Sequence, residues 1–401
     1  MIEYLENGTI TSVKGIKAAG IFCGLKKLKK DLALIYSDSP ATVGGTFTLN
    51  KVKAAPLLIS QGIIAKDQKV KAILINSGNA NACTGEKGYN NAIATQEFTA
   101  EHLGINKDEV LISSTGVIGQ QLNIEKIKEG IKSILLSSEL SAGHDAAEAI
   151  LTTDTFPKSF ACKVQLSKGE VRIGGICKGS GMIMPNMATM LAFVATDAEI
   201  PKPLVQKLIA EAVNKSFNRI SVDGDTSTND MVILMANGAS KVSITEENSD
   251  YQLFKVALRD LCKKMAMAIV KDGEGATKFI SVIVGSAKSE IDADSAAKAI
   301  VNSPLVKTAL YGADANWGRI LSAVGNSGIN FCPEKVMIKI GDLHLLNPGY
   351  DSNFDESIAR EILQKKDVDI TVELNEGDAS TTWWTCDFSE QYVKINANYR
   401  T

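Results

Sequence analysis

Short apolar runs, several of them alternating with polar residues, recur along the chain and predict β-strands with a buried face. The predicted strands are Leu32–Tyr36, Ala72–Ile75, Val110–Ile112, Met231–Leu234, Phe279–Val284, Val336–Ile340 and Val368–Val372. Two further β-prone runs flank the polar segment Ser167–Glu170, and together they predict a hairpin over Lys163–Cys177.

Apolar residues at helical spacing predict three helices between the strands. The stripes are Ile124, Ile127, Ile131 and Ile134; Leu204, Leu208, Ile209 and Val213; and Leu258, Leu261, Cys262, Met265 and Ile269. Pro201 and Pro203, near the start of the second stripe, are typical of a helix N-terminus. Strands that alternate with helices indicate a mixed α/β protein with substantial antiparallel sheet and helices outside it.

The composition is that of a folded globular protein. Of its 401 residues, 45% are hydrophobic and 22% are charged, and this length predicts about two or three domains. The net charge of −3 gives no electrostatic case for nucleic acid as a partner. No apolar run is long enough to span a bilayer, and Met1–Glu6 lacks the start of a secretory signal, so we expect no membrane association.

The number and spacing of the cysteines and histidines limit the kinds of metal site and catalytic site that this chain is expected to form. The seven cysteines are scattered and form no CxxC pair, so neither a disulfide framework nor a structural zinc site is expected, and the natural compartment is the cytoplasm. The chain has only three histidines, His102, His144 and His344. With so few, a histidine-based catalytic triad or metal cluster is not favoured. A nucleophile in this chain is therefore expected to use another base.

Glycine and small polar residues gather in four predicted loops. These are Asn76–Ala82, Ser113–Gly119, Cys177–Met182 and Asp272–Lys278. Such loops can bring backbone N–H groups to a ligand, although each alone is consistent with a tight turn, and none is a nucleotide-binding fingerprint. The segment Asp223–Asp230 begins like a calcium loop, but Thr228 and Leu234 replace the required Gly and Glu, so we expect a capped turn.

The segment Lys178–Leu191 is a glycine-rich loop that runs through Pro185 into Thr189. Its residue pattern alone makes Thr189 the first residue of a buried strand. The segment resembles the processing site of the ornithine acetyltransferase family, also called the glutamate N-acetyltransferase or ArgJ family. Members of that family cleave themselves between Ala and Thr of an Ala-Thr-Met-Leu motif, which here places the cleavage between Ala188 and Thr189. Further motifs resemble the family at Asn76–Ala82, Ser113–Gly119, Thr152–Thr155, Glu274–Lys278, Gly312–Arg319 and Asn396–Thr401.

The resemblance implies a layered α/β sandwich, similar in layers and chemistry to the N-terminal nucleophile hydrolases but different in connectivity. Cleavage would divide the protein into an α chain, residues 1–188, and a β chain, residues 189–401, that stay associated. The family assembles as dimers of such pairs, which implies an α2β2 heterotetramer here.

The resemblance also implies a reaction. Cleavage would make Thr189 an N-terminal threonine, whose α-amine, with a pKa of about 7.7–8.0, is a suitable base for its own hydroxyl. In a ping-pong cycle, Thr189 would take the acetyl group from N-acetyl-L-ornithine, release L-ornithine and pass the acetyl group to L-glutamate as N-acetylglutamate. This exchange of one amide for another implies neither a metal nor a cofactor.

The family's functional residues fall on matching positions of this chain. Thr115 and Gly116 match the oxyanion hole, which stabilises the tetrahedral intermediate. The matching substrate contacts are Thr152, with Thr153 and Thr155 beside it, Lys178, Thr189, Glu274, Asn396 and Thr401. The Lys178 cation suits the α-carboxylate of both substrates, and the Glu274 anion suits the ammonium of ornithine.

Three alternatives stay open. The chain could be a self-processing amidohydrolase or aminopeptidase, in which water replaces glutamate as the acceptor. It could be a binding or structural protein in which Thr189 is only a strand residue. Some family members also acetylate glutamate from acetyl-CoA; no residue decides this, and we favour the bifunctional alternative. The basic segment Lys26–Lys30 is interpreted as a solvated turn.

Overall fold

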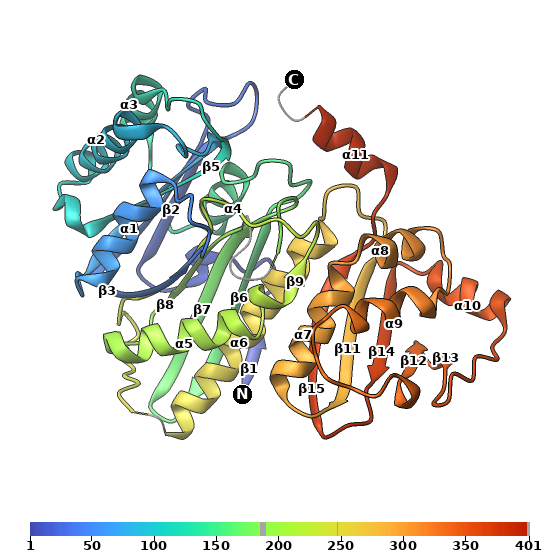
Figure 1. Cartoon of the computed structure of the whole chain (residues 1–401). Coiled ribbons are helices and arrows are strands. Elements are labelled where there is room, and N and C mark those ends of the chain that lie inside the picture. Colours follow the sequence, from blue (N-terminus) through green and yellow to red (C-terminus); the bar gives the residue numbers. More distant parts are fainter. Residues whose placement is uncertain (185–189, 247, 399–401) are drawn as a thin grey trace. The chain divides into compact units, whose positions relative to one another are not determined.

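The computed structural model describes residues 1–184, 190–246 and 248–398. They form two compact units. Unit 1 contains the described residues of 1–180, 190–218 and 225–269, and unit 2 contains those of 181–184, 219–224 and 270–398. Each unit has a β-sheet with helices packed on it (Figure 1), which confirms the predicted mixed α/β class. The predicted chain boundary between residues 188 and 189 lies outside the described residues and stays a prediction.

The sheet of unit 1 has nine strands within the described residues, and eight of them form a continuous path. In order across the sheet these are β1 (Ile2–Tyr4), β6 (Lys158–Leu166), β7 (Gly169–Lys178), β8 (Leu191–Thr196), β10 (Met231–Ala236), β3 (Leu32–Phe47), β4 (Val70–Asn79) and β5 (Val110–Val117), and β2 (Ile16–Ile21) pairs with β3 beside this path. The β8–β10 and β4–β5 pairs are parallel and the other pairs are antiparallel. The predicted hairpin is confirmed as β6–β7.

Strand β3 is longer than the predicted run Leu32–Tyr36. Its first part pairs with β2 and β4, and its last part pairs with β10, so one strand joins the two halves of the sheet. The pairing register with β4 shifts between Tyr36 and Ala41, where Ser39 and Pro40 are exposed. A polar segment that contains proline is typical of a turn, so the hydrophobic pattern predicted that the strand ends at Tyr36. Proline is also tolerated at a β-bulge, and here the strand continues through one.

Helices cover both faces of the β2–β5 half of this sheet (Figure 1). The helices of unit 1 are α1 (Ala55–Ala65), α2 (Gly85–Leu103), α3 (Ile124–Ser133), α4 (Leu140–Ala149), α5 (Lys202–Asn214) and most of α6 (Ser249–Lys271). Short 3-10 turns lie at Ile10–Ser12 and Lys107–Glu109, and a third, Phe217–Arg219, begins in unit 1 and ends in unit 2. Successive strand residues belong to two different cores: Ala33 and Ile35 pack on the side of α4, while Leu32 and Leu34 pack on the side of α2 and α3. Because both faces of the strand are buried here, the run Leu32–Ile35 is apolar throughout. The three predicted helices are confirmed as α3, α5 and α6.

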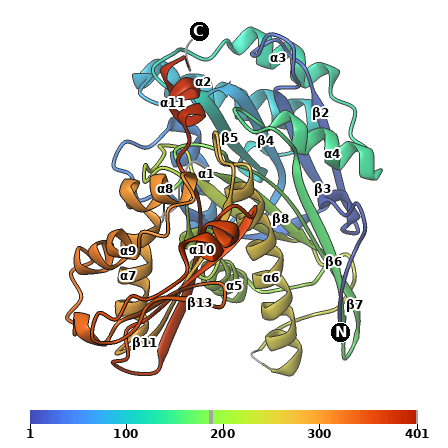
Figure 2. The ribbon, with the colours of Figure 1, turned by 90° about the vertical axis from the view of Figure 1, so that its right-hand side faces the viewer.

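The sheet of unit 2 has six strands within the described residues. Their order is β13 (Leu343–Leu346), β12 (Met337–Ile340), β14 (Asp367–Glu373), β11 (Phe279–Ala287), β15 (Ala379–Cys386) and β9 (Ile220–Ser221). The helices of this unit are α7 (Glu290–Val301), α8 (Pro304–Tyr311), α9 (Trp317–Gly325), α10 (Glu356–Leu363) and α11 (Glu390–Ala397), and a 3-10 turn lies at Pro333–Lys335. Figure 2 shows these elements from a second side.

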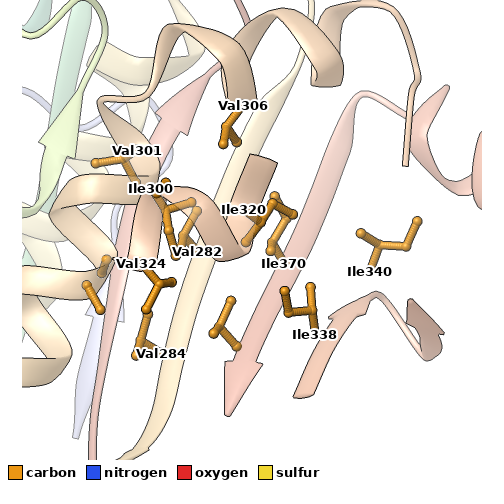
Figure 3. Close-up of a cluster of buried hydrophobic side chains, with 14 of the residues drawn as sticks. Val282, Val284, Ile300, Val301, Val306, Ile320, Val324, Ile338, Ile340 and Ile370 are labelled. Carbon is orange, nitrogen blue, oxygen red and sulfur yellow. The ribbon is translucent and has the colours of Figure 1, made fainter. Parts of the chain in front are cut away.

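The core of unit 2 lies between its sheet and helices α7 and α9 (Figure 3). Helix α7 begins at Ser289, whose side chain accepts a hydrogen bond from the Asp292 N–H, as expected of an N-cap. Its buried residues recur at helical spacing, and Ile300 and Val301 belong to the same buried cluster as Val282 and Val284 of β11. Among the described residues, no helix is long and apolar enough to cross a membrane.

Three of the four predicted loops are partly strand. Cys177 and Lys178 complete β7, Asn76–Asn79 complete β4, and Ser113–Val117 complete β5, so the loop prediction is wrong for these segments. The ends of β4 and β5 are paired with each other, and small side chains let these two strands approach closely where they end.

Candidate active site

Thr115 and Gly116 lie at the end of β5, beside the end of β4. Gly116 has a φ of +134°, and its partner in the register, Gly78, has a φ of +94°. A β-carbon on residue 116 would lie 2.4 Å from the Gly78 carbonyl carbon. Only glycine fits here, for reasons of both backbone conformation and space.

Thr115 is a buried residue, 3% exposed. Its hydroxyl makes no hydrogen bond to any described residue. An O–H with no structural partner is available as a donor, which is the property that an oxyanion hole requires.

A buried polar network fixes the ends of β4 and β5. The Ser114 hydroxyl donates to the Asn76 side-chain oxygen at 2.6 Å, and the Asn76 amide donates to the Asn79 carbonyl at 2.9 Å. The Asn229 amide donates to the carbonyls of Ala80 at 2.7 Å and Ser114 at 2.9 Å. Asn229 therefore joins the two strand ends. Sequence reasoning missed it, although it lies in the Asp- and Asn-rich segment that was interpreted as a capped turn.

Two buried lysines share one buried carboxylate at the end of β7. Asp154 and Lys158 are 2.8 Å apart, Asp154 and Lys178 are 3.8 Å apart, and all three side chains are at most 2% exposed. The Gly179 N–H also donates to Asp154, at 2.7 Å. Burial alone would raise the pKa of the Asp154 carboxyl, but Lys178 and Lys158 hold it well below its ordinary value. Two ammonium groups therefore lie at the end of β7, and a cation of this kind suits an anionic substrate group.

Asp154 also positions the predicted substrate residue Thr152. The Thr152 backbone N–H donates to Asp154 Oδ2 at 3.0 Å, and its hydroxyl lies 3.5 Å from the same oxygen. Thr152 and Lys178, predicted separately, are thus brought together through one carboxylate.

We expect Asp154→Asn to lower the free energy of unfolding by about 3–5 kcal/mol, because two buried ammonium groups lose their counter-charge. Urea unfolding at neutral pH measures this. The matched control is Asp145→Asn, which breaks the partly exposed pair with Lys30 and should cost less than about 1 kcal/mol. Equal, small losses in the two variants would contradict the expectation.

Two aspartates hold the chain on either side of the predicted cleavage point. In unit 2, Asp223 accepts the backbone N–H groups of Met182 at 2.6 Å and Ile183 at 2.8 Å. In unit 1, the fully buried Asp230 accepts the Met190 N–H at 3.1 Å. Burial raises the pKa of Asp230 well above its ordinary value, so this carboxyl is neutral over a wider pH range than an exposed one. Both residues come from the segment that resembled a calcium loop.

In unit 2, Glu274 and Asn396 are brought together. The Asn396 amide donates to Glu274 Oε2 at 2.8 Å, and Glu274 is 7% exposed. A β-carbon on Gly181 would lie 2.4 Å from the Glu274 carboxylate, so this glycine makes room for it. Gly275, with a φ of +70°, lets the chain turn immediately after Glu274.

The remaining predicted residues, Ala188, Thr189 and Thr401, lie outside the described residues. The histidines take part in none of these clusters: His144 bonds to Asn7 and Ser159, and His344 bonds to Asn347. No group of three or more His, Cys, Asp or Glu side chains suited to a metal occurs in the described part of the chain.

Comparisons with known proteins give the family. A solved structure of ornithine acetyltransferase in complex with ornithine, from Mycobacterium tuberculosis, is 35% identical over 46% of this chain and 98% of that chain, with a TM-score of 0.43. A protein from Caldanaerobacter subterraneus, named arginine biosynthesis bifunctional protein ArgJ, is 50% identical over the full length of both chains. The protein of the same name from Chlorobaculum tepidum is 49% identical over 96% of each chain. The sequence model of the ArgJ family matches residues 17–401, and the chain belongs to this family.

Proposed function

We propose that this protein is a self-cleaving acetyltransferase of arginine biosynthesis, which transfers the acetyl group of N-acetyl-L-ornithine to L-glutamate. Membership of the ArgJ family supports the pathway. The observation that carries the chemistry is the hydroxyl of the buried residue Thr115, which has no hydrogen-bond partner among the described residues. It lies next to a glycine whose backbone is set by close contact with Gly78.

The first step is cleavage of the chain before Thr189. The Thr189 hydroxyl attacks the Ala188 carbonyl carbon, the peptide becomes an ester as the nitrogen is released, and water hydrolyses the ester. Residues 1–188 become the α chain and residues 189–401 the β chain, which assemble as α2β2. The hydrogen bonds of Asp223 to Met182 and Ile183, and of Asp230 to Met190, hold the described residues that precede and follow this segment.

The mature reaction is ping-pong. The Thr189 amine takes the hydroxyl proton while the hydroxyl oxygen attacks the acetyl carbon of N-acetylornithine. The tetrahedral oxyanion is stabilised by the Thr115 hydroxyl and the Gly116 N–H. The C–N bond then breaks, and ornithine leaves with the proton. Glutamate attacks the acetyl-Thr189 ester by the reverse sequence and leaves as N-acetylglutamate.

The substrate-binding residues are assigned by the charge of the substrate group that each one binds. Lys178, held by Asp154, binds the α-carboxylate that both substrates carry, with Thr152 beside it. Glu274 binds the ammonium of ornithine, and Asn396, which donates to Glu274, orients that carboxylate. Thr401 contributes a further contact at the end of the chain. No cofactor is needed, and the compartment is the cytoplasm.

We favour a second activity, acetylation of glutamate from acetyl-CoA. Formation of N-acetylglutamate with acetyl-CoA as the sole donor would support it, and no product under conditions where N-acetylornithine is an active donor would exclude it.

The Glu274→Gln variant tests whether Glu274 binds the ammonium of ornithine. Glutamine can still accept the Asn396 hydrogen bond but carries no charge, so we expect KM for N-acetylornithine to rise about 10- to 100-fold. Steady-state ornithine release measures this, with KM for glutamate in the second half-reaction as the internal control. Unchanged ornithine release and KM would refute the role of Glu274.

A further inference from the structure

Lys26 belongs to the basic segment Lys26–Lys30, which the sequence predicted to be a solvated turn. Its neighbours Lys27 and Lys29 are exposed, but Lys26 is half-buried. The buried carboxylate of Asp31 accepts the backbone N–H groups of Lys26 at 2.8 Å and Cys23 at 2.6 Å, and this fixes the backbone at residue 26. Lys26 is therefore a positioned residue within a surface segment.

The Lys26 side chain passes Gly78 and ends at the carbonyl of Leu151. Its Cγ lies 3.0 Å from the position that a β-carbon on Gly78 would occupy, and Gly78 is the register partner of Gly116. Its ammonium donates to the carbonyl of Leu151 at 3.0 Å, one residue before Thr152. The ammonium is also close enough to Lys178 for the two charges to interact.

The charges around Lys26 favour an anionic ligand. Lys26 and Lys178 interact with each other, and both interact with Asp154, so two ammonium groups come together in partly desolvated surroundings. The carboxylate of an amino acid has two oxygens and can accept hydrogen bonds from two cations at once.

We propose that Lys26 is a substrate-binding residue, which together with Lys178 binds the α-carboxylate shared by the acetyl donor and the acetyl acceptor. The inference rests on the proposed function and adds a contact to it. Gly78, whose φ of +94° already favours glycine, also leaves room for the stem of Lys26.

The proposal predicts a pH dependence. Burial lowers the pKa of Lys26 to about 8; Asp31 and Asp154 act in the opposite direction, and Lys29 and Lys178 add to the lowering. Lys126 donates to the neighbouring Gly24 carbonyl and adds positive charge to the same segment. Because the protonated form binds the carboxylate, KM should be low below pH 8 and should rise as the pH passes through this pKa.

Lys26→Met tests the proposal, with N-acetylputrescine as the probe because it is N-acetylornithine without the α-carboxylate. We expect Lys26→Met to raise KM for N-acetylornithine and for glutamate about tenfold or more, and to leave kcat/KM for N-acetylputrescine nearly unchanged. The alkaline rise in KM should disappear in this variant. Lys26→Arg, which keeps the charge, should recover part of the affinity, and the exposed control Lys27→Met should behave like the parent.

Equal losses for the substrates with and without the carboxylate would overturn the proposal, because they would indicate a structural role. Unchanged KM values would overturn it as well. If the parent itself releases no ornithine, the proposed function fails, and binding is then measured directly by calorimetry. Equal affinities of the parent and of Lys26→Met for N-acetylornithine would then reject the role of Lys26.

Discussion

Thr189→Ala should remain a single chain of 401 residues, whereas the parent separates into two chains under denaturing conditions. The variant lacks the hydroxyl that attacks the Ala188 carbonyl and, because it stays uncut, also lacks the free amine that acts as the base. Acetyl transfer should fall by about four orders of magnitude or more, since nucleophile and base are lost together. Intact mass spectrometry and ornithine release measure the two effects.

Thr189→Ser provides the matched control. Serine keeps a hydroxyl and an amine, so this variant should still be cut at the same bond and should keep measurable activity. A Thr189→Ala preparation that is cleaved before residue 189, or that transfers acetyl groups at a rate near that of the parent, would contradict the mechanism.

Thr115→Val should lower kcat by about 100- to 1,000-fold, the usual effect of removing one oxyanion-hole donor. KM should change little, because the hydroxyl meets the oxyanion and not the ground-state substrate. Self-cleavage, which passes through a similar intermediate, should also slow. Stability should not fall, because the Thr115 hydroxyl has no hydrogen-bond partner among the described residues and valine fills the same space. Steady-state kinetics and thermal unfolding measure these effects.

Ser113→Ala is the control for this prediction. Ser113 lies two positions before Thr115 in the same strand, and its buried hydroxyl likewise has no hydrogen-bond partner in the described part of the chain. It should keep both the activity and the stability of the parent. A Thr115→Val enzyme with the kcat of the parent would exclude Thr115 from the oxyanion hole.

The sequence predicted the architecture because the pattern depends on which faces are buried. Alternation and helical stripes identified the core strands and helices α3, α5 and α6. The extension of β3 past Tyr36 was missed because Ser39 and Pro40 are tolerated at a bulge that only the partner strand reveals. The length predicted two or three domains, but the boundaries of the two units were not predicted, because the chain passes between the units several times without a linker.

The candidate site, like the fold, was predicted only in part from the sequence. The resemblance named Thr152 and Lys178, but the carboxylate that joins them, Asp154, was not singled out. Lys26 and Asn229 were missed because their roles depend on residues distant in the sequence: Leu151 accepts from Lys26, and Ala80 and Ser114 accept from Asn229. Residue type alone does not distinguish a positioned lysine from a solvated one.

The central claim is that an acetyl group passes through Thr189. The most direct test is the denatured mass of both chains after brief incubation with N-acetylornithine alone, followed by a second measurement after glutamate is added. The account predicts that the chain beginning at Thr189 gains one acetyl group and then loses it as N-acetylglutamate. A chain that stays whole, an unmodified second chain while ornithine is released, or acetate as the only product in the presence of glutamate would contradict it.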